Sequence, residues 1–214
     1  MGLFKKLLNR KANICVYSEK DQDTYENMVT KHIGTFDEVF HEIVSPDLHI
    51  DIIVIPPSAD RDHYTLLTMG AGAYKMSVPA SYGKMNRAEF AVRLPKNWDI
   101  HSNDEKWCWP IDMLKTLARM PYNEKSWLGV YHDVDFGSPF SDETELCCVL
   151  LDIFDEQVPP LPLENKDQLI VYTAIPIYRS EMEYKTAAGA EALLQKMSND
   201  TIHGPIDIHR NKVI

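Results

Sequence analysis

The sequence predicts an α+β fold in which helices flank a mixed, mainly antiparallel β-sheet. Two observations support this class. Short β-branched or alternating apolar segments outnumber the segments with helical periodicity. Along the chain a helix comes first, then several strands, a second helix, more strands and a last helix, and one sheet with helices on its faces accommodates this order best. The chain has 214 residues, of which 44% are hydrophobic and 25% are charged, as expected for one globular domain.

The N-terminal half begins with a predicted helix and continues with strands. Residues 23–32 place their apolar side chains at the spacing of one buried helical stripe. A strand is predicted from about Val39 to Val44, and the turn residues Ser45-Pro46-Asp47 then indicate a hairpin with the next strand. Three further strands are predicted at residues 49–55, 64–69 and 88–94.

The C-terminal half contains two more predicted helices. Pro110 is expected to open the first of them and Pro121 to end it, because proline suits only the first turn of a helix. The second is expected from Ser180 to about Met197, since Ser180 and Glu183 have the spacing of a capping box. Strands are predicted at residues 127–131, 146–154, 169–177 and, as a short last strand, 206–208.

The alternation within the strands predicts which side chains face the core. Glu89 and Arg93 are expected to face outward, because the residues between and around them form an apolar inner face. His49 and Asp51 are expected at the end of their strand where the second face of the sheet is uncovered.

The four cysteines do not indicate a metal site or a disulfide scaffold. Their spacing fits no common metal-binding pattern, and there are too few of them to staple a secreted domain. Cys147 and Cys148 are adjacent in an apolar strand, so we expect them on opposite faces as buried small hydrophobic residues.

The N-terminal segment favours a cytoplasmic protein. Lys5 and Lys6 interrupt the apolar residues that a secretory signal needs. No apolar run approaches the ~18–20 residues that span a bilayer. A short docking or frayed helix is favoured over contact with a membrane surface. We therefore predict a tail or short docking helix at residues 1–22 and a single domain at residues 23–214.

The charge balance excludes general binding to nucleic acid. The chain has 22 Lys and Arg against 32 Asp and Glu, which gives a net charge of −10. An acidic surface repels phosphate backbones. The same charge would steer a basic protein partner toward the surface.

Motifs for nucleotide binding or for serine hydrolysis are incomplete. Gly70 and Gly72 follow a predicted strand, but the third glycine of a dinucleotide loop would fall at Lys75 and no helix is expected to open there. The two glycines instead indicate a tight turn or bulge with a positive φ angle. The sequence contains no G-x-S-x-G elbow.

Polar residues near strand ends leave one enzymatic alternative open. His49, Asp51 and His63, together with His132, could gather as acid–base groups or metal ligands, although half-exposed polar residues at strand ends explain them as well. The sequence Asp133-Val134-Asp135 could hold a cation or be solvated. The alternative function is therefore a hydrolase or metal-dependent enzyme that uses a His/Asp cluster.

The aromatic residues are unevenly distributed. The tryptophans crowd into one window around the second helix, where core packing is expected: Trp98, Trp107, Trp109 and Trp127. Tyr64, Tyr74 and Tyr82 flank the glycine turn, and for these residues burial in the core and contact with a partner are about equal alternatives.

Taken in order and spacing, these segments resemble a suppressor of fused domain, from about residue 23 to the end of the chain. The matching segments are His49–Pro57, Tyr64–Gly70, Arg87–Pro95, Trp109–Arg119, Trp127–Gly129, Ile175–Tyr178, Glu181–Leu194 and Arg210. The resemblance implies a protein-binding module without enzymatic activity, cofactor or metal. The animal relative holds a peptide of a transcription factor as an added strand between its two halves, and this chain resembles the N-terminal half only.

The resemblance also implies a partner and candidate contact residues. Short bacterial members are proposed to be immunity proteins that neutralise toxins, which makes a basic toxin domain the expected partner; a regulatory scaffold without a toxin partner is the other binding alternative. The peptide-contacting region of the family maps to Tyr64, Gly70, Gly72 and Tyr74. Together with Asp51, these positions are the candidate partner-binding residues.

Overall fold

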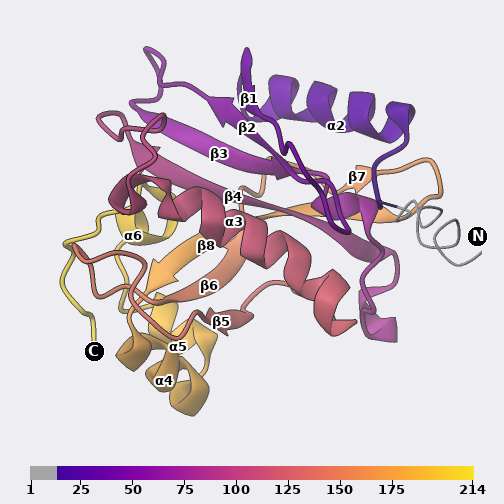
Figure 1. Ribbon diagram of the computed structural model, residues 1–214. Coiled ribbons are helices and arrows are strands. Elements are labelled where there is room, and N and C mark those ends of the chain that lie inside the picture. Colours follow the sequence, from indigo (N-terminus) through magenta and orange to yellow (C-terminus); the bar gives the residue numbers. More distant parts are fainter. Residues whose placement is uncertain (1–13) are drawn as a thin grey trace, which may run out of the picture.

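The computed structural model describes residues 14–214, so residues 1–13 of the predicted N-terminal tail or docking helix lie outside the described part. The core of the fold is an eight-stranded sheet with the strand order β1-β2-β3-β4-β8-β6-β5, and β7 pairs separately with β8. Only β4 and β8 pair in parallel among the strands of this part of the chain. The predicted mixed, mainly antiparallel sheet with flanking helices is confirmed (Figure 1).

The strands follow the predicted order, and most of them lie where alternation or β-branching placed them. Their bounds are β1 Glu38–Phe40, β2 Asp51–Ile55, β3 His63–Met69, β4 Met85–Pro95, β5 Asp133–Asp135, β6 Cys148–Ile153, β7 Leu161–Pro162 and β8 Gln168–Ile177. The helices are α2 Glu19–His32, α3 Glu105–Glu124, α4 Arg179–Ala188, α5 Ala190–Leu194 and α6 Asn199–His203, with short 3₁₀ turns η1 Ala71–Ala73 and η2 Ala80–Tyr82.

Helices cover both faces of the sheet, which we call the α3 face and the α2 face. Alternate strand residues such as Ile52 and Phe90 join α3 in the largest core cluster. The intervening residues face the other way. Near β2 and β3 they pack beneath α2, as Ile53 does, and near β6 and β8 they pack beneath α4 and α5, as Ile177 does. Figure 1 shows α2 beside β1–β3 and α4 and α5 beside β5 and β6.

Helix α2 starts four residues before the predicted Asp23. Ser18 caps it, because its side chain accepts a hydrogen bond from the Asp21 N–H at 3.1 Å. The buried stripe consists of Tyr25, Met28 and Val29, in agreement with the predicted periodicity.

Helix α3 passes through both prolines, so the predicted boundaries at Pro110 and Pro121 are wrong. Asp104 caps the helix five residues earlier than expected, and the helix ends at Glu124, where the C-cap residue Lys125 adopts a left-handed conformation with φ of 50°. Both prolines are buried against the sheet. Burial of the apolar stripe therefore outweighs the hydrogen bonds that the prolines cannot donate.

Two predicted strands are loops. In residues 127–131, Gly129 lies beneath the ring of Trp127 and Tyr131 has a φ of +65°, which is incompatible with a strand. In residues 206–208, Ile206 donates one hydrogen bond to the Arg93 carbonyl at 2.9 Å, but no ladder forms. Strand β1 is also shorter than predicted and ends at residue 40.

The predicted last helix is broken and capped differently. Gly189 adopts a φ of +95° and separates α4 from α5. Glu181, rather than Glu183, accepts the hydrogen bond from the backbone N–H of the capping residue, Tyr178, at 2.9 Å. Arg210 also holds Glu181, at 2.7 Å, so this carboxylate joins the start of α4 to the C-terminal segment.

Several side chains point differently from the predictions. Glu89 and Asp51 are buried, with 0% and 5% of their surface exposed, because α2 and the segments around it cover the face that we expected to be open. Arg93 lies half-buried on the same face. Cys147 and Cys148 are buried as predicted, but their sulfur atoms lie 3.7 Å apart in one cluster, because Cys147 precedes the strand. None of the helices within residues 14–214 combines the length and apolar composition of a bilayer crossing.

We expect Arg210→Ala to lower the free energy of unfolding by about 3–5 kcal/mol, because it leaves the fully buried Glu181 carboxylate without its charged partner. Urea unfolding measures this change. Lys212→Ala is the control, since Lys212 pairs with the exposed Glu145 and its removal should change little. Equal effects of the two substitutions would contradict the role of the buried pair.

Candidate functional site

The turn that follows β3 forms the centre of the candidate site, and we call residues 70–74 the glycine turn. Gly70 has a φ of +126°, which confirms the predicted positive angle. A side chain at Gly70 would also collide with the His49 carbonyl oxygen. Gly72 has no positive φ angle; glycine is needed there because the Tyr17 hydroxyl approaches its Cα.

One buried carboxylate, that of Glu89, anchors the N–H groups of the glycine turn. Its Oε1 atom accepts hydrogen bonds from the Gly70 N–H at 2.9 Å, the Gly72 N–H at 3.0 Å and the Tyr17 hydroxyl at 2.5 Å. Its Oε2 atom accepts from the Thr68 hydroxyl at 2.5 Å. Glu89 therefore ties β3, β4, the turn and the N-terminal segment together.

The environment of Glu89 sets an unusual protonation equilibrium. Burial raises its pKa to about 7, although the four hydrogen bonds favour the ionised form. Within residues 14–214, no cationic side chain lies within ion-pair distance of the carboxylate. The carboxyl group therefore changes its charge near neutral pH.

Arg87 anchors the carbonyl groups of the same turn. It lies two residues before Glu89 on the same face of β4 and donates hydrogen bonds to the Gly72 carbonyl at 3.1 Å and the Ala73 carbonyl at 2.5 Å. Its other nitrogens bind the Asp167 carboxylate at 3.1 and 2.9 Å. Burial opposes ionisation of Asp167, but its hydrogen bonds, including those from Arg87, hold its pKa below the usual range.

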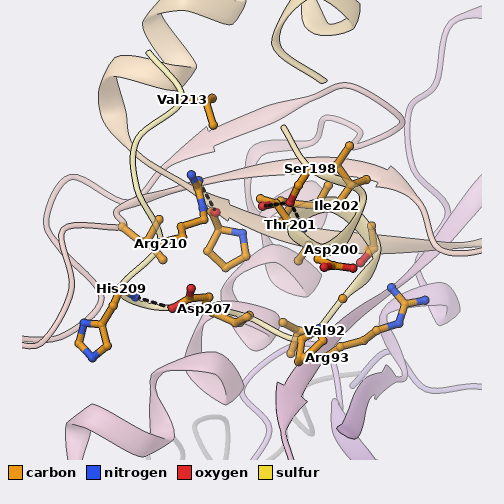
Figure 2. A pocket seen from close by; sticks show the side chains of 18 of the residues that line it. Val92, Arg93, Ser198, Asp200, Thr201, Ile202, Asp207, His209, Arg210 and Val213 are labelled. Atoms are coloured by element: carbon orange, nitrogen blue, oxygen red, sulfur yellow. Dashed lines mark hydrogen bonds between the residues drawn. The ribbon is translucent and has the colours of Figure 1, made fainter. Parts of the chain in front are cut away.

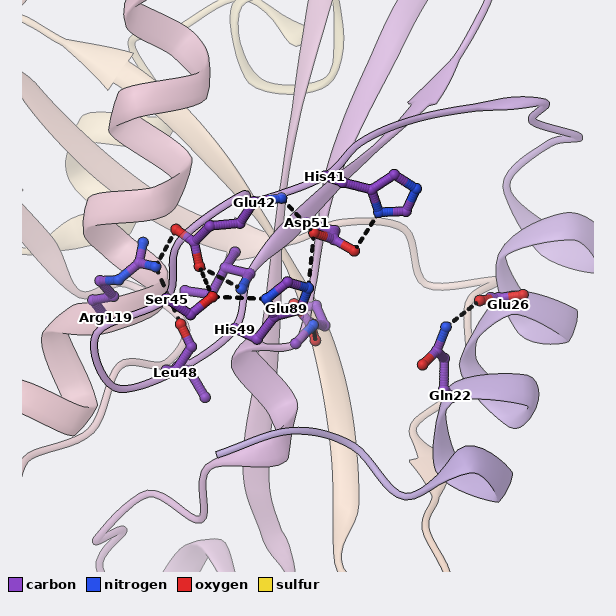
Figure 3. Close-up of polar contacts among 12 residues, drawn as sticks. Gln22, Glu26, His41, Glu42, Ser45, Leu48, His49, Asp51, Glu89 and Arg119 are labelled. Atoms are coloured by element: carbon purple, nitrogen blue, oxygen red, sulfur yellow. Dashed lines mark hydrogen bonds and ion pairs between the residues drawn. The ribbon is translucent and has the colours of Figure 1, made fainter. Parts of the chain in front are cut away.

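A second network lies beside the turn, in the loop that joins β1 to β2 (Figure 3). Asp51 accepts hydrogen bonds from the Glu42 N–H at 2.8 Å, and its carboxylate lies 2.9 Å from His41 Nδ1 and 3.1 Å from His49 Nε2. The Ser45 hydroxyl lies 2.7 Å from His49 Nδ1. Asp51 pairs across the sheet with Met69, so this loop lies next to Gly70.

Arg119 ties the loop to α3. It binds Glu42 and donates to the Leu48 carbonyl at 3.1 Å. Burial opposes ionisation of Glu42, but its hydrogen bonds with Ser45, the Ile50 N–H and Arg119 lower the pKa of its carboxyl group. The loop is thus held from both sides by charged hydrogen bonds.

The Ser45, His49 and Asp51 contacts have the order of a hydrolase relay but not its proton arrangement. Ser45 donates its single hydroxyl proton to Glu42 at 2.7 Å, so it accepts from His49 Nδ1. The other nitrogen of His49 faces the Asp51 carboxylate at 3.1 Å. Because the serine proton is directed at the Glu42 carboxylate rather than at the imidazole, the arrangement is structural rather than nucleophilic.

The remaining residues of the enzymatic alternative lie elsewhere. His63 begins β3 and is separated from Met69, the partner of Asp51, by six residues, or about 20 Å along the strand. The ring of His132 packs against that of Trp127 at a tilt of 57°, with 4.1 Å between the ring centroids. Within the described residues, no group of three or more His, Cys, Asp or Glu side chains could hold a metal ion.

The two carboxylates of the D-x-D sequence also have protein partners. Asp133 pairs with Lys185, and Asp135 accepts a hydrogen bond from Arg179 at 2.8 Å. These ion pairs join β5 to α4, so the carboxylates have a structural role, which differs from both alternatives that the sequence left open, a cation site and solvated side chains.

The candidate partner-binding residues divide into two groups. Gly70, Gly72, Tyr74 and Asp51 lie together at one end of the sheet. Tyr64 pairs with Leu94 near the other end of β3, again about 20 Å from the glycine turn. A single small epitope cannot contain all five residues.

Aromatic side chains extend the surface around the glycine turn. The ring of Tyr74 meets that of Tyr122 edge-on at 5.3 Å, and the Lys125 amine lies 4.2 Å from the Tyr122 ring. Nearby, Tyr82 packs on Trp127 at 4.6 Å. Trp98 and Trp109 are buried as expected, whereas Trp107 and Trp127 are half-buried at the edge of the core.

Sequence reasoning missed the residues that hold the site. These residues are separated by up to 150 positions, and no local pattern relates them. They are Tyr17, Arg87, Glu89, Arg119 and Asp167. One signal was present in the sequence. Glu89 is a charged residue in the middle of a strand that could be covered on both of its faces, and a charge at such a position indicates a buried polar network.

We expect the pH dependence of stability to report on Glu89. Its folded pKa of about 7 lies above the ordinary 4.5, so the stability that it contributes is complete below pH 4.5 and is lost as the pH rises through 7. The loss is on the order of 3 kcal/mol. Glu89→Gln mimics the protonated form, so its stability relative to wild type should rise between pH 5 and pH 8 in urea unfolding. A constant difference across this range would contradict the assignment.

We expect Gly70→Ala to destabilise the fold more than Gly137→Ala. Both glycines have positive φ angles, which cost alanine about 1–2 kcal/mol. Only at Gly70 does a backbone atom occupy the space of the new methyl group, whereas no atom lies within 4 Å at Gly137. Thermal unfolding measures the loss of stability in each variant. Equal losses would show that the turn accommodates the methyl group at Gly70 without an additional loss of stability.

Comparison with known proteins identifies relatives of the whole fold. Residues 46–211 match the family model of the suppressor of fused protein (SUFU). The uncharacterized protein UU111 of Ureaplasma parvum serovar 3 is 22% identical over 205 residues, which cover 92% of this chain and 98% of the relative.

Solved structures show the same fold. A SUFU homologue from Neisseria gonorrhoeae superposes with a TM-score of 0.65 at 15% identity, over 92% of this chain and 98% of the homologue. The structure of a Sufu–Fu complex gives a TM-score of 0.65 at 12% identity, over 94% and 93% of the two chains. Drosophila Suppressor of Fused gives 0.56 at 15% identity, over 78% of this chain and 43% of that protein. Because the family model covers most of its length, the chain belongs to the suppressor of fused protein (SUFU) family.

Proposed function

We propose that this chain is a non-enzymatic protein-binding module that neutralises a cognate toxin by stoichiometric binding. The observation that carries the binding role is the similarity, over nearly the full length of both chains, to a protein solved as a Sufu–Fu complex. A relative with this fold is solved in a protein complex. In this chain, the histidines and carboxylates of the enzymatic alternative lie apart or are bound to other protein groups. Both observations support protein binding over catalysis.

The glycine turn supplies the rigid part of the proposed surface. Glu89 and Arg87 bind the N–H and carbonyl groups of the turn from inside the protein, so its position is fixed before a partner arrives. Tyr74, the last residue of the turn, is half-buried, and half-buried Tyr122 of α3 contacts its ring. Preorganised tyrosines offer large contact area at a low entropic cost, which is typical of the residues that dominate binding energy.

Charge supports a basic partner. The net charge of −10 attracts cationic proteins and repels nucleic acid. A toxin that acts on nucleic acid carries a basic active surface, and an acidic protein can cover it. Binding of this kind blocks the toxin sterically and requires equal amounts of the two proteins.

The test begins with the gene beside the one that encodes this chain, which we expect to encode a large secreted protein with a C-terminal toxin domain. That toxin domain is then co-expressed with this chain. We expect growth to be restored and a complex with 1:1 stoichiometry to be measured by light scattering after gel filtration. If far less than one equivalent of this chain suppressed the toxin, and the toxin were found modified or degraded, stoichiometric binding would be contradicted. Restoration of growth without any complex would also contradict it.

We expect Tyr74→Ala to weaken that complex by about 2 kcal/mol, or roughly 30-fold, if the tyrosine is an anchor of the interface. Calorimetric titration measures the affinity, and circular dichroism checks that the variant is folded. Tyr184→Ala is the control, because it removes a half-buried tyrosine from α4, away from the turn. An unchanged affinity of the Tyr74 variant would remove this residue from the interface.

A further inference from the structure

The cavity near the C-terminal segment is lined by polar groups that the protein itself engages. It has a volume of about 530 Å³ and lies between the sheet, α6 and residues 204–213 (Figure 2). Arg210 donates to Glu181 at 2.7 Å, and Asp207 accepts the His209 N–H at 2.9 Å. By contrast, apolar side chains near the start of β2 are left in contact with water.

Four exposed aliphatic side chains lie where the first described residues meet the loop between β1 and β2. Residues 14–214 expose seven large apolar side chains, and four of these are Ile14, Val16, Ile43 and Val44. We call Ile43 and Val44, whose exposed fractions are 97% and 78%, the aliphatic tip. Isolated exposed apolar residues are ordinary, but four of them on adjoining segments indicate a surface that contacts something other than water.

Backbone hydrogen bonds place the two segments side by side. The Cys15 N–H donates to the Asp47 carbonyl at 2.8 Å, and the His49 N–H donates to the Cys15 carbonyl at 3.1 Å. Cys15 packs against the core, so its neighbours Ile14 and Val16 are the ones left exposed. The chain therefore enters the described part of the fold beside the loop that carries the tip.

Charged groups hold the loop that carries the tip (Figure 3). The Ser45 hydroxyl donates to the Glu42 carboxylate at 2.7 Å and so closes the loop behind the tip. Arg119 binds Glu42 and lies 3.4 Å from Asp47. The two carboxylates that flank the tip are thus neutralised, and a loop that is already ordered loses little entropy when its tip enters another phase.

The sequence that precedes Ile14 is basic. Residues 1–18 contain no Asp or Glu, and their four cations are Lys5, Lys6, Arg10 and Lys11. The rest of the chain has 18 Lys and Arg against 32 Asp and Glu. Apolar residues recur at helical spacing in the same stretch, namely Leu3, Phe4, Leu7 and Leu8. Basic sequences with this spacing are typical of segments that bind anionic membrane surfaces.

The exposed tip changes the balance between the alternatives for the first residues. The sequence alone favoured a docking or frayed helix over contact with a membrane surface. The tip and its neighbours Ile14 and Val16 add the apolar area that such a contact needs, at the point where the basic stretch joins the fold.

A membrane also fits this surface better than a second copy of the chain. A symmetric contact between two copies would bring the same cations of each chain together, and like charges repel. Four aliphatic side chains cover much less than the ~800 Å² per partner that a stable protein interface buries. An anionic bilayer attracts the cations and accepts the aliphatic side chains at once.

We propose that residues 1–11 and the aliphatic tip bind the surface of an anionic phospholipid bilayer. The cations lie among the headgroups, and the tip enters the interface together with Ile14 and Val16. The contact is peripheral and reversible, and it does not depend on the proposed toxin partner.

Co-sedimentation of the full chain with vesicles tests the proposal. The vesicles contain phosphatidylcholine with about 30% phosphatidylglycerol, and vesicles of pure phosphatidylcholine are the comparison. We expect half-maximal binding at roughly 0.1–1 mM accessible lipid on the anionic vesicles, and at least about tenfold weaker binding without phosphatidylglycerol. NaCl at about 0.5 M should weaken binding, because salt screens the cations. No binding to the anionic vesicles, or equal binding to both kinds, would overturn the proposal.

Substitutions at the tip test whether it enters the membrane. Ile43→Ser combined with Val44→Ser should weaken binding to the anionic vesicles at least about tenfold and leave the thermal midpoint unchanged, because both side chains are exposed. Ile214→Ser is the control, since it removes an exposed aliphatic side chain from the other end of the described chain. Binding that survives the double substitution would contradict the role of the tip.

Substitutions of lysines test the basic stretch. Lys5→Glu combined with Lys6→Glu should weaken binding at least about tenfold. Lys84→Glu combined with Lys96→Glu changes the total charge equally at exposed positions elsewhere and should have a smaller effect. Equal effects of the two pairs would show that only the net charge matters and would overturn the assignment to residues 1–11.

Sedimentation velocity without vesicles tests the other occupant of the surface. We expect the chain to show no self-association that depends on the tip. Self-association that Ile43→Ser with Val44→Ser abolishes, in a chain that does not bind the anionic vesicles, would assign the tip to a second copy and overturn the proposal.

Discussion

The buried carboxylate of Glu89 is the constraint on which the functional end of this protein depends. It accepts four hydrogen bonds from three segments and has no cation beside it, so its burial is costly unless every donor stays in place. The N-terminal segment, β3 and the glycine turn must therefore order together. Arg87 adds the matching constraint on the carbonyl side, and the two residues fix a turn that could otherwise adopt many conformations.

This arrangement separates the parts that give stability from the parts that we propose contact a partner. The charged residues that hold the turn are inside, on the α2 face, where a partner cannot reach them. Tyr74 follows the backbone groups that this interior network holds, and its ring meets that of Tyr122 on α3 at the surface. Surface residues can then change with the partner while Glu89 and Arg87 keep the backbone of the turn in place, which suits a binding fold whose solved relatives share only 12–15% identity with this chain.

The strands β2, β3, β4, β6 and β8 could be predicted because β-branched alternation is a local signal, and α2 because its apolar stripe is regular. The orientation of Glu89 could not be predicted, since alternation shows which residues share a face but not whether a helix covers that face. Pro110 and Pro121 indicated helix ends, yet packing of α3 against the sheet outweighed that local preference. Contacts such as Tyr17 with Glu89 or Arg210 with Glu181 join residues 72 and 29 positions apart, and nothing in the local sequence relates them.

Amide hydrogen exchange at Gly70 and Gly72 measures the central claim most directly. If Glu89 holds the turn, both amides exchange as slowly in the free protein as the paired amides of β3, although they belong to a turn. Exchange of these two amides as fast as that of an exposed loop residue would show that the turn is not preorganised, and the physical basis of the account would be lost.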